Sequence, residues 1–301
     1  MSRIDEALKR VSGATVSDRC DPAVEETGLR VSDALIDQYP HETRPAPQAV
    51  HRIEKPRRRV AVPLTGRAIR HNGFDGSLKG KLVVADDTPS VSVEQYRRLA
   101  AAVHELQIDS GLKTLMVTSA LPREGKTLTV TNLALTLTES YGRRVLLIDA
   151  DLRRPSIHQV FNLANVKGLG ELLRSDCQEL PAFEVTPRLS VLPAGRPDSN
   201  PIAGLTSDRM RELLEHSAAS FDWVLVDAPP VTLLPDAQLL ARLTRAVIFV
   251  IGAGSTPYAM VERAVTEVGR DSIVGTVLNR IGDQHIPATE YYGEYVGRPA
   301  S

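Results

Sequence analysis

Short, unbroken apolar runs that alternate with helix-like segments constrain this chain more than any other feature of its 301 residues. Because the runs are continuous and do not alternate with polar residues, they suit strands that are buried on both faces. The runs lie at 114–118, 145–148, 223–226, 246–251 and 273–278, with a weaker one at 189–192. The helical candidates lie near 126–140, 207–219, 236–243 and 257–269. This alternation predicts right-handed βαβ units, and hence an α/β fold with a mostly parallel central sheet flanked by helices.

Residues 1–88 have a different composition. Six prolines interrupt them, and their charges are scattered without a sustained apolar period. Such a segment buries too little apolar surface to offset its chain entropy, so we expect a largely disordered N-terminal region. A short amphipathic helix near residues 2–11, with Ile4, Leu8 and Val11 on one face, is the exception, either as a docking helix or without a role. The expected boundaries are an N-terminal region at 1–88, a strand–helix domain at 89–285 and a tail at 286–301.

Composition excludes several classes of protein. Lys and Arg number 36 and Asp and Glu number 37, so the net charge of −1 argues against a polycation bound to nucleic acid, and no nucleic-acid partner is expected. The two cysteines, Cys20 and Cys177, have no metal-ligand spacing and are too few for a disulfide framework, which favours a reducing compartment. No apolar stretch approaches the roughly 18–20 residues that span a bilayer, and the N-terminus has no secretory apolar region. We therefore expect a cytoplasmic protein.

A phosphate-binding loop follows the first apolar run. Residues 120–127 fit a Walker A motif, with alanine in place of the first glycine. In such a loop, backbone N–H groups face a polyphosphate at the N-terminus of a helix. Lys126 can reach the β- and γ-phosphates, and the hydroxyl of Thr127 can bind Mg²⁺. The predicted nucleotide contacts in this stretch are Ala120, Leu121, Pro122, Arg123, Glu124, Gly125, Lys126, Thr127 and Leu128.

Carboxylates stand at the ends of two further runs. Asp149 and Asp151 are two residues apart, so their side chains point the same way from an extended chain. Asp227 closes the run at 223–226, and Arg153 lies just beyond the first pair. The carboxyl ends of parallel strands meet at one edge of a sheet, where ligands bind. Together with the phosphate loop, this pattern predicts nucleotide binding and phosphoryl transfer, which depends mostly on positioning and charge neutralisation.

These residues resemble the motifs of the BY-kinases, which are bacterial protein-tyrosine kinases of polysaccharide synthesis and export. The resemblance covers about 90–298, with a Walker A′ stretch at 149–153 and a Walker B stretch that ends at Asp227. Further matches are Gly195, Asn200-Pro201 and Leu278-Asn279-Arg280. In the family the last stretch contacts adenine, so Asn279 and Arg280 join the expected nucleotide contacts. The resemblance implies a P-loop NTPase fold of the SIMIBI/MinD-like kind, with ATP and Mg²⁺ as cofactors.

The same resemblance implies an autokinase that regulates exopolysaccharide or capsule synthesis or export. Lys126 would neutralise charge on the transferred phosphoryl group, Asp149 would orient or deprotonate the incoming tyrosine, and Arg153 would steady the phosphates. The expected catalytic residues are Lys126, Asp149, Asp151 and Arg153, and the expected metal ligands are Thr127, Asp151 and Asp227.

A tyrosine cluster lies at the end of the chain. Three of the seven tyrosines fall in the last 11 residues, beside two glycines. A flexible terminal position suits a substrate peptide that enters another subunit's site, as the family's terminal tyrosines do. We expect phosphorylation in trans at Tyr291, Tyr292 and Tyr295. An ordinary aromatic tail that packs on the core is the alternative.

The resemblance also implies partners. Because the chain contains no membrane segment, it implies a transmembrane polysaccharide co-polymerase on a separate chain, which activates the kinase and recruits it to the inner face of the membrane. It further implies a homo-oligomer formed through the helix that contains Glu94 and Arg97. The chain departs from the family at three positions: Arg123 replaces a glycine, Leu128 a hydroxyl residue that contacts the α-phosphate, and Ala100 an arginine of the oligomer helix.

Two other functions remain open on the sequence. A ParA/MinD-like positioning ATPase would act by nucleotide-gated dimerisation, but it carries a signature lysine where this chain has Leu121. Lys126 is the only lysine from 114 to 166. A non-enzymatic nucleotide-binding adaptor of a polysaccharide export complex would fit Leu128 and the altered oligomer helix. Incubating the purified protein with Mg·ATP and probing for phosphotyrosine distinguishes the kinase, the positioning ATPase and the adaptor.

Overall fold

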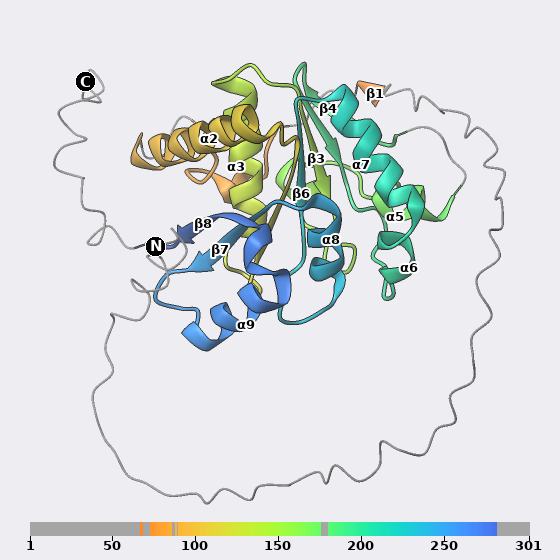
Figure 1. The fold of residues 1–301 in the computed structure, drawn as a ribbon. Coiled ribbons are helices and arrows are strands. Elements are labelled where there is room, and N and C mark those ends of the chain that lie inside the picture. Colours follow the sequence, from red (N-terminus) through yellow and green to blue (C-terminus); the bar gives the residue numbers. More distant parts are fainter. Residues whose placement is uncertain (1–66, 69–72, 86–87, 89, 176–179, 282–301) are drawn as a thin grey trace, which may run out of the picture. The chain divides into compact units, whose positions relative to one another are not determined.

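The computed structural model describes residues 67–68, 73–85, 88, 90–175 and 180–281. The helix expected near residues 2–11 and the tyrosines of the tail lie outside these ranges. Within them, the strands form one eight-stranded sheet of order β1-β4-β5-β3-β6-β2-β7-β8, parallel except for the β4–β5 pair. The strands are β1 (Arg67–Ala68), β2 (Thr114–Ser119), β3 (Val145–Asp149), β4 (Phe183–Thr186), β5 (Leu189–Leu192), β6 (Trp223–Asp227), β7 (Val247–Gly252) and β8 (Ile273–Asn279). The predicted α/β architecture is confirmed (Figure 1).

The helices fill the connections between the strands. The α-helices are α2 (Ser90–Ser110), α3 (Lys126–Glu139), α4 (Ile157–Val160), α5 (Leu169–Arg174), α6 (Ile202–Leu205), α7 (Asp208–Ser220), α8 (Asp236–Thr244) and α9 (Tyr258–Val268), and two 3-10 turns are η1 (Gly76–Leu78) and η2 (Arg270–Ser272). Helices α3, α7, α8 and α9 lie within a residue or two of the predicted ranges, whereas the 21-residue α2 was expected only through the resemblance that places Glu94 and Arg97 on a helix. Helices α4, α5 and α6 and strand β4 were not expected, because elements of four to six residues are too short to show a periodic pattern.

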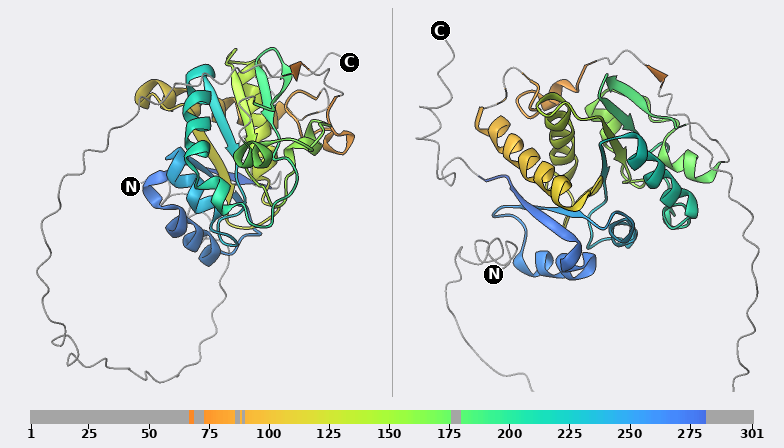
Figure 2. Two further views of the ribbon diagram at one scale, coloured as in Figure 1. Left: turned by 90° about the vertical axis from the view of Figure 1, so that its right-hand side faces the viewer. Right: turned by 45° about the horizontal axis from the view of Figure 1, so that its top comes forward.

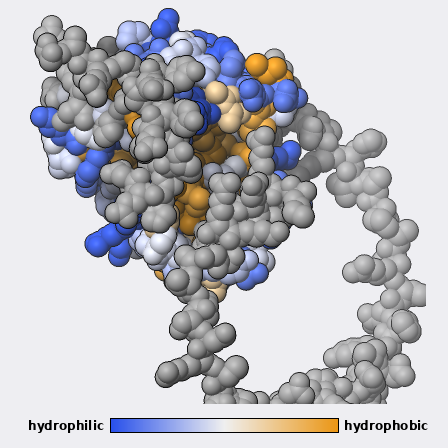
Figure 3. All heavy atoms as spheres, turned by 90° about the vertical axis from the view of Figure 1, so that its left-hand side faces the viewer, coloured by the Kyte–Doolittle hydropathy of each residue, from blue (hydrophilic) through white to orange (hydrophobic). Residues whose placement is uncertain are grey.

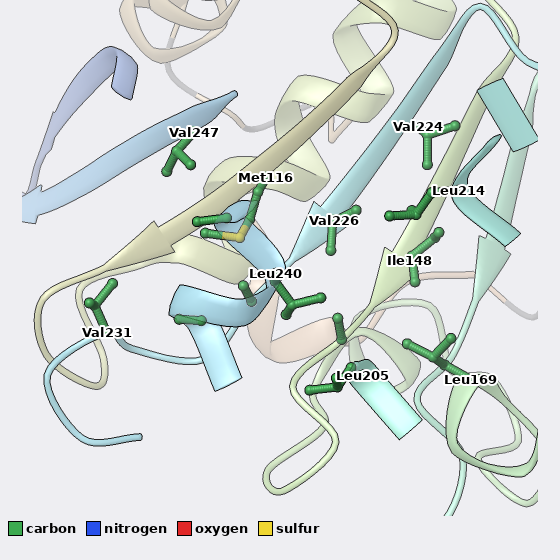
Figure 4. Packing of buried hydrophobic residues seen from close by; sticks show 14 of the residues in the cluster. Met116, Ile148, Leu169, Leu205, Leu214, Val224, Val226, Val231, Leu240 and Val247 are labelled. Atoms are coloured by element: carbon green, nitrogen blue, oxygen red, sulfur yellow. The ribbon is translucent and has the colours of Figure 1, made fainter. Parts of the chain in front are cut away.

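Two hydrophobic clusters cover the two faces of the sheet. Along each central strand, successive apolar side chains point alternately into one cluster and the other, which explains why the runs are unbroken. One cluster packs the sheet against α2, α3 and α4. The other packs it against α5 to α9, with Met116 of β2 close to Leu240 of α8 (Figure 4). Figure 2 shows these helices on both sides of the sheet.

The order of the central strands brings the chemically interesting residues to one edge. Strand β6 lies between β3 and β2, and both pairs are parallel. Asp149 of β3 is in register with Asp227 of β6, which is in register with Val117 of β2. The carboxyl ends of the three strands, and the loops that follow them, therefore meet at the same place.

The folded domain begins earlier than the boundary expected at residue 89. Leu82 is only 1% exposed and belongs to the cluster beneath α2 and α3. The side chain of Asn132 in α3 donates to the carbonyl of Lys81 (2.9 Å) and accepts from the N–H of Val83 (3.0 Å). The ring of Phe74 lies 5.6 Å from that of Phe161. Residues 73–85 are thus held by a few specific contacts that the polar composition of the segment concealed.

Strand β8 forms one edge of the sheet and is half-buried along most of its length. Seen from that side, the domain carries apolar surface, orange in Figure 3, between hydrophilic margins. Val274 of β8 and Ile281 just beyond it expose 40% and 38% of their surface. Among the helices that the structure describes, none combines the length and the apolar character needed to cross a bilayer.

Candidate active site

The loop between β2 and α3 is built for close approach of a ligand to its backbone. Gly125 caps α3 with φ +97°, a conformation that favours glycine. A Cβ atom on Gly125 would lie 2.0 Å from the side-chain nitrogen of Asn279, at the end of β8. That nitrogen donates a hydrogen bond of 2.8 Å to the carbonyl of Glu124. Any larger residue at position 125 would therefore push the loop and β8 apart.

Lys126 lies at the centre of a buried charge cluster. Its ammonium nitrogen is 3.2 Å from Oδ2 of Asp151 and 3.5 Å from Oδ1 of Asp227. The hydroxyl of Thr127 donates to Oδ2 of Asp227 at 2.7 Å and lies 3.1 Å from the hydroxyl of Ser156. The loop after β2, the loop after β3 and the end of β6 thus bring one cation, one hydroxyl and the carboxylates of Asp151 and Asp227 within hydrogen-bond or ion-pair distance; Asp149, predicted to join them, does not.

Burial and mutual repulsion shift the pKa values in this cluster. Burial raises the pKa of Asp149 to about 8, assisted by the charge of Asp227 and opposed by the backbone N–H groups of Ile157 and Ser156 and by Lys126. Burial also raises the pKa of Asp227, against the attraction of Lys126 and a hydrogen bond from Thr127. For Lys126, burial lowers the pKa, but the charges of the surrounding carboxylates outweigh it and the net pKa is raised. The ammonium group of Lys126 therefore stays protonated, while burial favours the protonated form of Asp149 and of Asp227.

One buried carboxylate oxygen invites a cation. Oδ1 of Asp227 accepts no hydrogen bond, although Asp227 is fully buried; it meets the Lys126 ammonium only as an ion pair at 3.5 Å. A buried, unsatisfied acceptor is costly, and a metal ion would satisfy it. In the described part of the chain no group of three or more His, Cys, Asp or Glu side chains is placed to hold a metal. This sparse set fits Mg²⁺, which takes one or two carboxylates and otherwise keeps water and phosphate oxygens.

The two carboxylates of the Walker A′ stretch lie at different depths. Oδ2 of Asp149 accepts from the N–H groups of Ser156 and Ile157, both at 3.0 Å, and Oδ1 accepts from the N–H of Asp151 at 3.2 Å. Both oxygens of Asp149 are thus engaged with the backbone, and Asp149 does not line the cleft described below. Asp151 does line the cleft.

Arg153 lines the cleft, and the carboxylate of Asp236 holds its guanidinium. Its Nε donates to Oδ2 of Asp236 at 2.7 Å, and its Nη2 lies 3.3 Å from Oδ1 of the same residue. The hydrogen bond from Arg153 to Asp236 raises the pKa of the guanidinium further. Asp236 is 1% exposed and stands in the first turn of α8. Because a bidentate pair fixes the arginine fork, Arg153 joins the loop after β3 to α8 as well as facing the cleft.

The whole site opens into a cleft of about 900 Å³. This size suits a ligand as large as a nucleotide. Its lining combines the loop after β2, the loop after β3, the segment after β6 and η1, and it includes most of the predicted nucleotide contacts. The predicted residues on the lining are Pro122, Arg123, Gly125, Lys126, Thr127, Leu128, Asp151, Arg153 and Arg280. Among the described residues, the predicted ones that are not on the lining are Ala120, Leu121, Glu124, Asp149, Asp227 and Asn279.

Comparison with known proteins assigns the family. No protein-family model matches the chain. The chain is 34% identical over 217 residues to the tyrosine-protein kinase YwqD of Bacillus subtilis, which spans 70% of this chain and 90% of that protein. The chain belongs to the bacterial protein-tyrosine kinases. It is also 32% identical over 207 residues to the succinoglycan biosynthesis transport protein ExoP of Rhizobium meliloti, covering 66% of this chain and 26% of that protein. The solved kinase domain of the Escherichia coli tyrosine kinase ETK superposes with a TM-score of 0.60 at 30% identity, over 68% of this chain and 82% of that domain.

Membership of the kinase family confirms the resemblance that the motifs indicated, and it favours a protein-tyrosine kinase over the positioning ATPase and the adaptor. The P-loop fold predicted from the sequence is therefore shared with solved tyrosine kinases.

The phosphate loop contains a buried glutamate that the sequence pattern indicated only as one more nucleotide contact. Glu124 is 4% exposed, and its Oε2 accepts from the N–H of Leu121 at 2.6 Å. Its Oε1 accepts from the N–H of Gly252 at 3.1 Å and from the hydroxyl of Thr256. Glu124 thus ties the phosphate loop to the end of β7. The sequence did contain a signal for this role, because a glutamate inside a loop that binds phosphate has to be neutralised or held away from the ligand.

The helix expected to mediate oligomers presents only part of the predicted pattern. Glu94 forms ion pairs with Arg97 at 3.7 Å and with Arg98 at 3.9 Å on the outer face of α2. Ala100 is fully buried in the cluster between α2 and the sheet. An arginine at position 100 would have to emerge from that core. Arg98 instead supplies the second cation next to Glu94.

Proposed function

We propose that this kinase uses Mg·ATP to phosphorylate Tyr291, Tyr292 and Tyr295 in trans, on the tail of an identical subunit. One observation carries the proposal: Lys126, Thr127 and Asp151 on the cleft lining converge with Asp227, which is buried behind them, from three neighbouring strand ends. Convergence of a lysine, a hydroxyl and carboxylates next to a phosphate loop is the arrangement that phosphoryl transfer requires. The tail itself lies outside the described residues.

The residues divide the work by position. The loop at 120–125 and the first turn of α3 would hold the triphosphate with backbone N–H groups. Arg280, on the cleft lining, would contact the base, while Asn279 holds the carbonyl of Glu124. Thr127 and Asp227, with Asp151, would hold Mg²⁺, which supplies charge neutralisation at the phosphates when bound. Lys126 is protonated, and its ammonium lies beside both carboxylates. It is therefore placed to neutralise the negative charge that develops on the phosphoryl group during transfer.

The phenol of tyrosine must lose its proton as its oxygen bonds to phosphorus and ADP leaves. Asp149 has the raised pKa that a base requires, but both its oxygens are bonded to backbone N–H groups away from the cleft. Asp151 lines the cleft, so it is the carboxylate of this stretch that the hydroxyl can reach, although its Oδ2 pairs with Lys126 and its Oδ1 accepts from the N–H of Arg154. Asp149 then acts by holding residues 151, 156 and 157 in place.

We further infer a role in exopolysaccharide or capsule synthesis or export, supported by the name of the relative ExoP, a succinoglycan biosynthesis transport protein. A transmembrane co-polymerase on a separate chain would then recruit the kinase to the inner face of the membrane and activate it. Self-association through the face of α2 that carries Glu94, Arg97 and Arg98 would bring the tail of one copy to the site of the next.

Two variants test the transfer and its direction together. The first carries Tyr291→Phe, Tyr292→Phe and Tyr295→Phe and keeps the site intact; the second carries Lys126→Met and keeps the tail. Incubated with Mg·ATP, neither alone gains phosphotyrosine, whereas a mixture labels the Lys126→Met chain. Lys167→Met, an exposed lysine outside the cleft, is the matched control and labels itself like the wild type. Labelling of isolated Lys126→Met refutes the site, and an unlabelled mixture refutes transfer in trans.

A further inference from the structure

The cleft holds more positive charge than its buried cluster uses. Five cationic side chains line it: Arg123, Lys126, Arg153, Arg154 and Arg280. Lys126 is paired with buried carboxylates, and Arg153 is paired with Asp236. The remaining three arginines are exposed, and among the described residues none of them has an acidic side chain within ion-pair distance.

These three arginines come from different parts of the fold. Arg123 stands in the phosphate loop, Arg154 follows β3 and Arg280 follows β8. The acids on the same lining are Asp151, which pairs with Lys126, and Asp75, whose carboxylate accepts two hydrogen bonds from Ser77. The three exposed arginines therefore outnumber the half-buried Asp75 and leave the rim of the cleft positively charged.

An apolar surface stands on the same rim. Pro229, Pro230 and Leu233 line the cleft directly after β6; the two prolines are largely buried, and Leu233 exposes 55% of its surface. An exposed leucine beside a prolyl pair offers an aromatic ring a surface to pack on. The cleft thus presents two kinds of recognition next to the buried site: apolar contact for a ring and guanidinium groups for anions.

The sequence contains one segment with the complementary pattern. Of the seven tyrosines, only Tyr291 and Tyr295 have a glutamate immediately before them, Glu290 and Glu294. Both lie in the tail that the proposed function assigns as substrate. An Arg–carboxylate pair is a strong, directional contact, and it would place a neighbouring tyrosine near the buried cluster.

We propose that the exposed arginines of the cleft, with Arg154 as the principal contact, recognise the glutamates that precede Tyr291 and Tyr295 in the tail of a second copy of the chain. This inference rests on the proposed function. The substrate class of the site is then an acidic tyrosine peptide, and the repeated Glu-Tyr unit allows the tail to bind in two registers. Arg154 is the residue to test, because Arg123 and Arg280 also belong to the expected nucleotide contacts.

The separated donor and acceptor described above allow each side of the contact to be changed alone. The donor is the chain with three phenylalanines in the tail, and the acceptor is the Lys126→Met chain. We expect Arg154→Gln in the donor to raise the KM for the acceptor about fivefold, with kcat and ATP affinity changed less than twofold. We expect the acceptor with Glu290→Gln and Glu294→Gln to raise KM to a similar extent. Combining both changes should add little, because they remove the same contact.

Charge exchange gives the sharper test. An Arg154→Glu donor should discriminate against the wild-type tail and recover at least half of the lost kcat/KM with an acceptor that carries Glu290→Lys and Glu294→Lys. The matched controls are Arg242→Gln in the donor, an exposed arginine on α8, and Glu262→Gln in the acceptor, an exposed acid on α9. Neither should change KM.

The outcomes separate this inference from the proposed function. If the unchanged donor does not label the unchanged acceptor, the proposed function fails first. Two outcomes overturn the inference while labelling proceeds: KM is the same for every charge variant, or KM does not rise with ionic strength. In either case the exposed arginines of the cleft do not bind the glutamates of the tail. If Arg154→Gln weakens ATP binding as much as it raises KM, Arg154 serves the nucleotide and the inference is overturned.

Discussion

Two groups of charges in this kinase have similar chemistry and opposite surroundings. In the cleft, Lys126 lies 3.2 and 3.5 Å from Asp151 and Asp227, and all three are buried. On α2, Glu94 lies 3.7 and 3.9 Å from two arginines that are each more than half exposed. In the first group, the pKa of Lys126 is raised because the neighbouring carboxylates outweigh burial, and burial raises the pKa of Asp227, whereas water screens the second group. Distance alone does not tell which ion pair matters; burial does.

The largest effect should come from removing one buried carboxylate. Asp227→Asn keeps the shape of the side chain but removes the charge that faces Lys126, Thr127 and the expected Mg²⁺. We expect tyrosine phosphorylation to fall at least about 100-fold, because electrostatic groups in a water-poor site contribute about 3 kcal/mol or more to the transition state. Initial rates of labelling at saturating Mg·ATP measure it. Asp208→Asn, an exposed acid on α7, is the control, and a rate within threefold of wild type for Asp227→Asn would contradict the role.

The next effect tests the brace behind the phosphate loop. Glu124→Ala leaves the N–H groups of Leu121 and Gly252 without their acceptor, so we expect the free energy of unfolding to drop by about 2–3 kcal/mol. Urea denaturation monitored by the single tryptophan, Trp223, measures it. Glu139→Ala, an exposed glutamate at the end of α3, should change it by less than about 0.5 kcal/mol. Equal losses in both variants would show that Glu124 is no brace.

A pH series tests the buried carboxylates without ligand. The pKa of Asp149 is raised to about 8 in the folded protein, against about 3.9 in the unfolded chain, so the folded state binds this proton more tightly. The stabilisation is full below about pH 4 and is lost as pH rises through 8, with a slope of at most about 1.4 kcal/mol per pH unit. Asp149→Asn should flatten the fall in the free energy of unfolding between pH 6 and pH 8. Parallel profiles for the variant and the wild type would be the opposite result.

The smallest effect is expected on the surface of α2. Arg98→Ala removes an exposed partner of Glu94, and the free energy of unfolding should change by less than about 0.5 kcal/mol, with less effect still at high salt. Sedimentation at several protein concentrations examines the same variant for self-association. A large loss of stability would mean that exposed and buried pairs do not differ as proposed. A weakened oligomer with unchanged stability would support an interface on this face.

The sequence predicted the central strands because burial on both faces leaves a simple, unbroken apolar signal. Strands β2, β3, β6, β7 and β8 and the helices α3, α7, α8 and α9 lie within a residue or two of the expected positions. The segment at 73–85 gave no such signal, because it is fixed by single contacts such as Leu82 in the core and Asn132 at its backbone. Contacts between residues about 50 positions apart leave no local pattern.

The chemical identity of the site was determined by the sequence alone, since a phosphate loop and carboxylates at strand ends need only local residue types and the rule that parallel strands end together. The tertiary structure decided what each residue faces. It placed Asp149 behind the cleft and Asp151 in it, bound Arg153 to Asp236, and used Glu124 to hold the loop to β7. Depth and hydrogen-bond partners depend on which distant segments meet, and that is fixed only when the strand order and the packing of the helices are known.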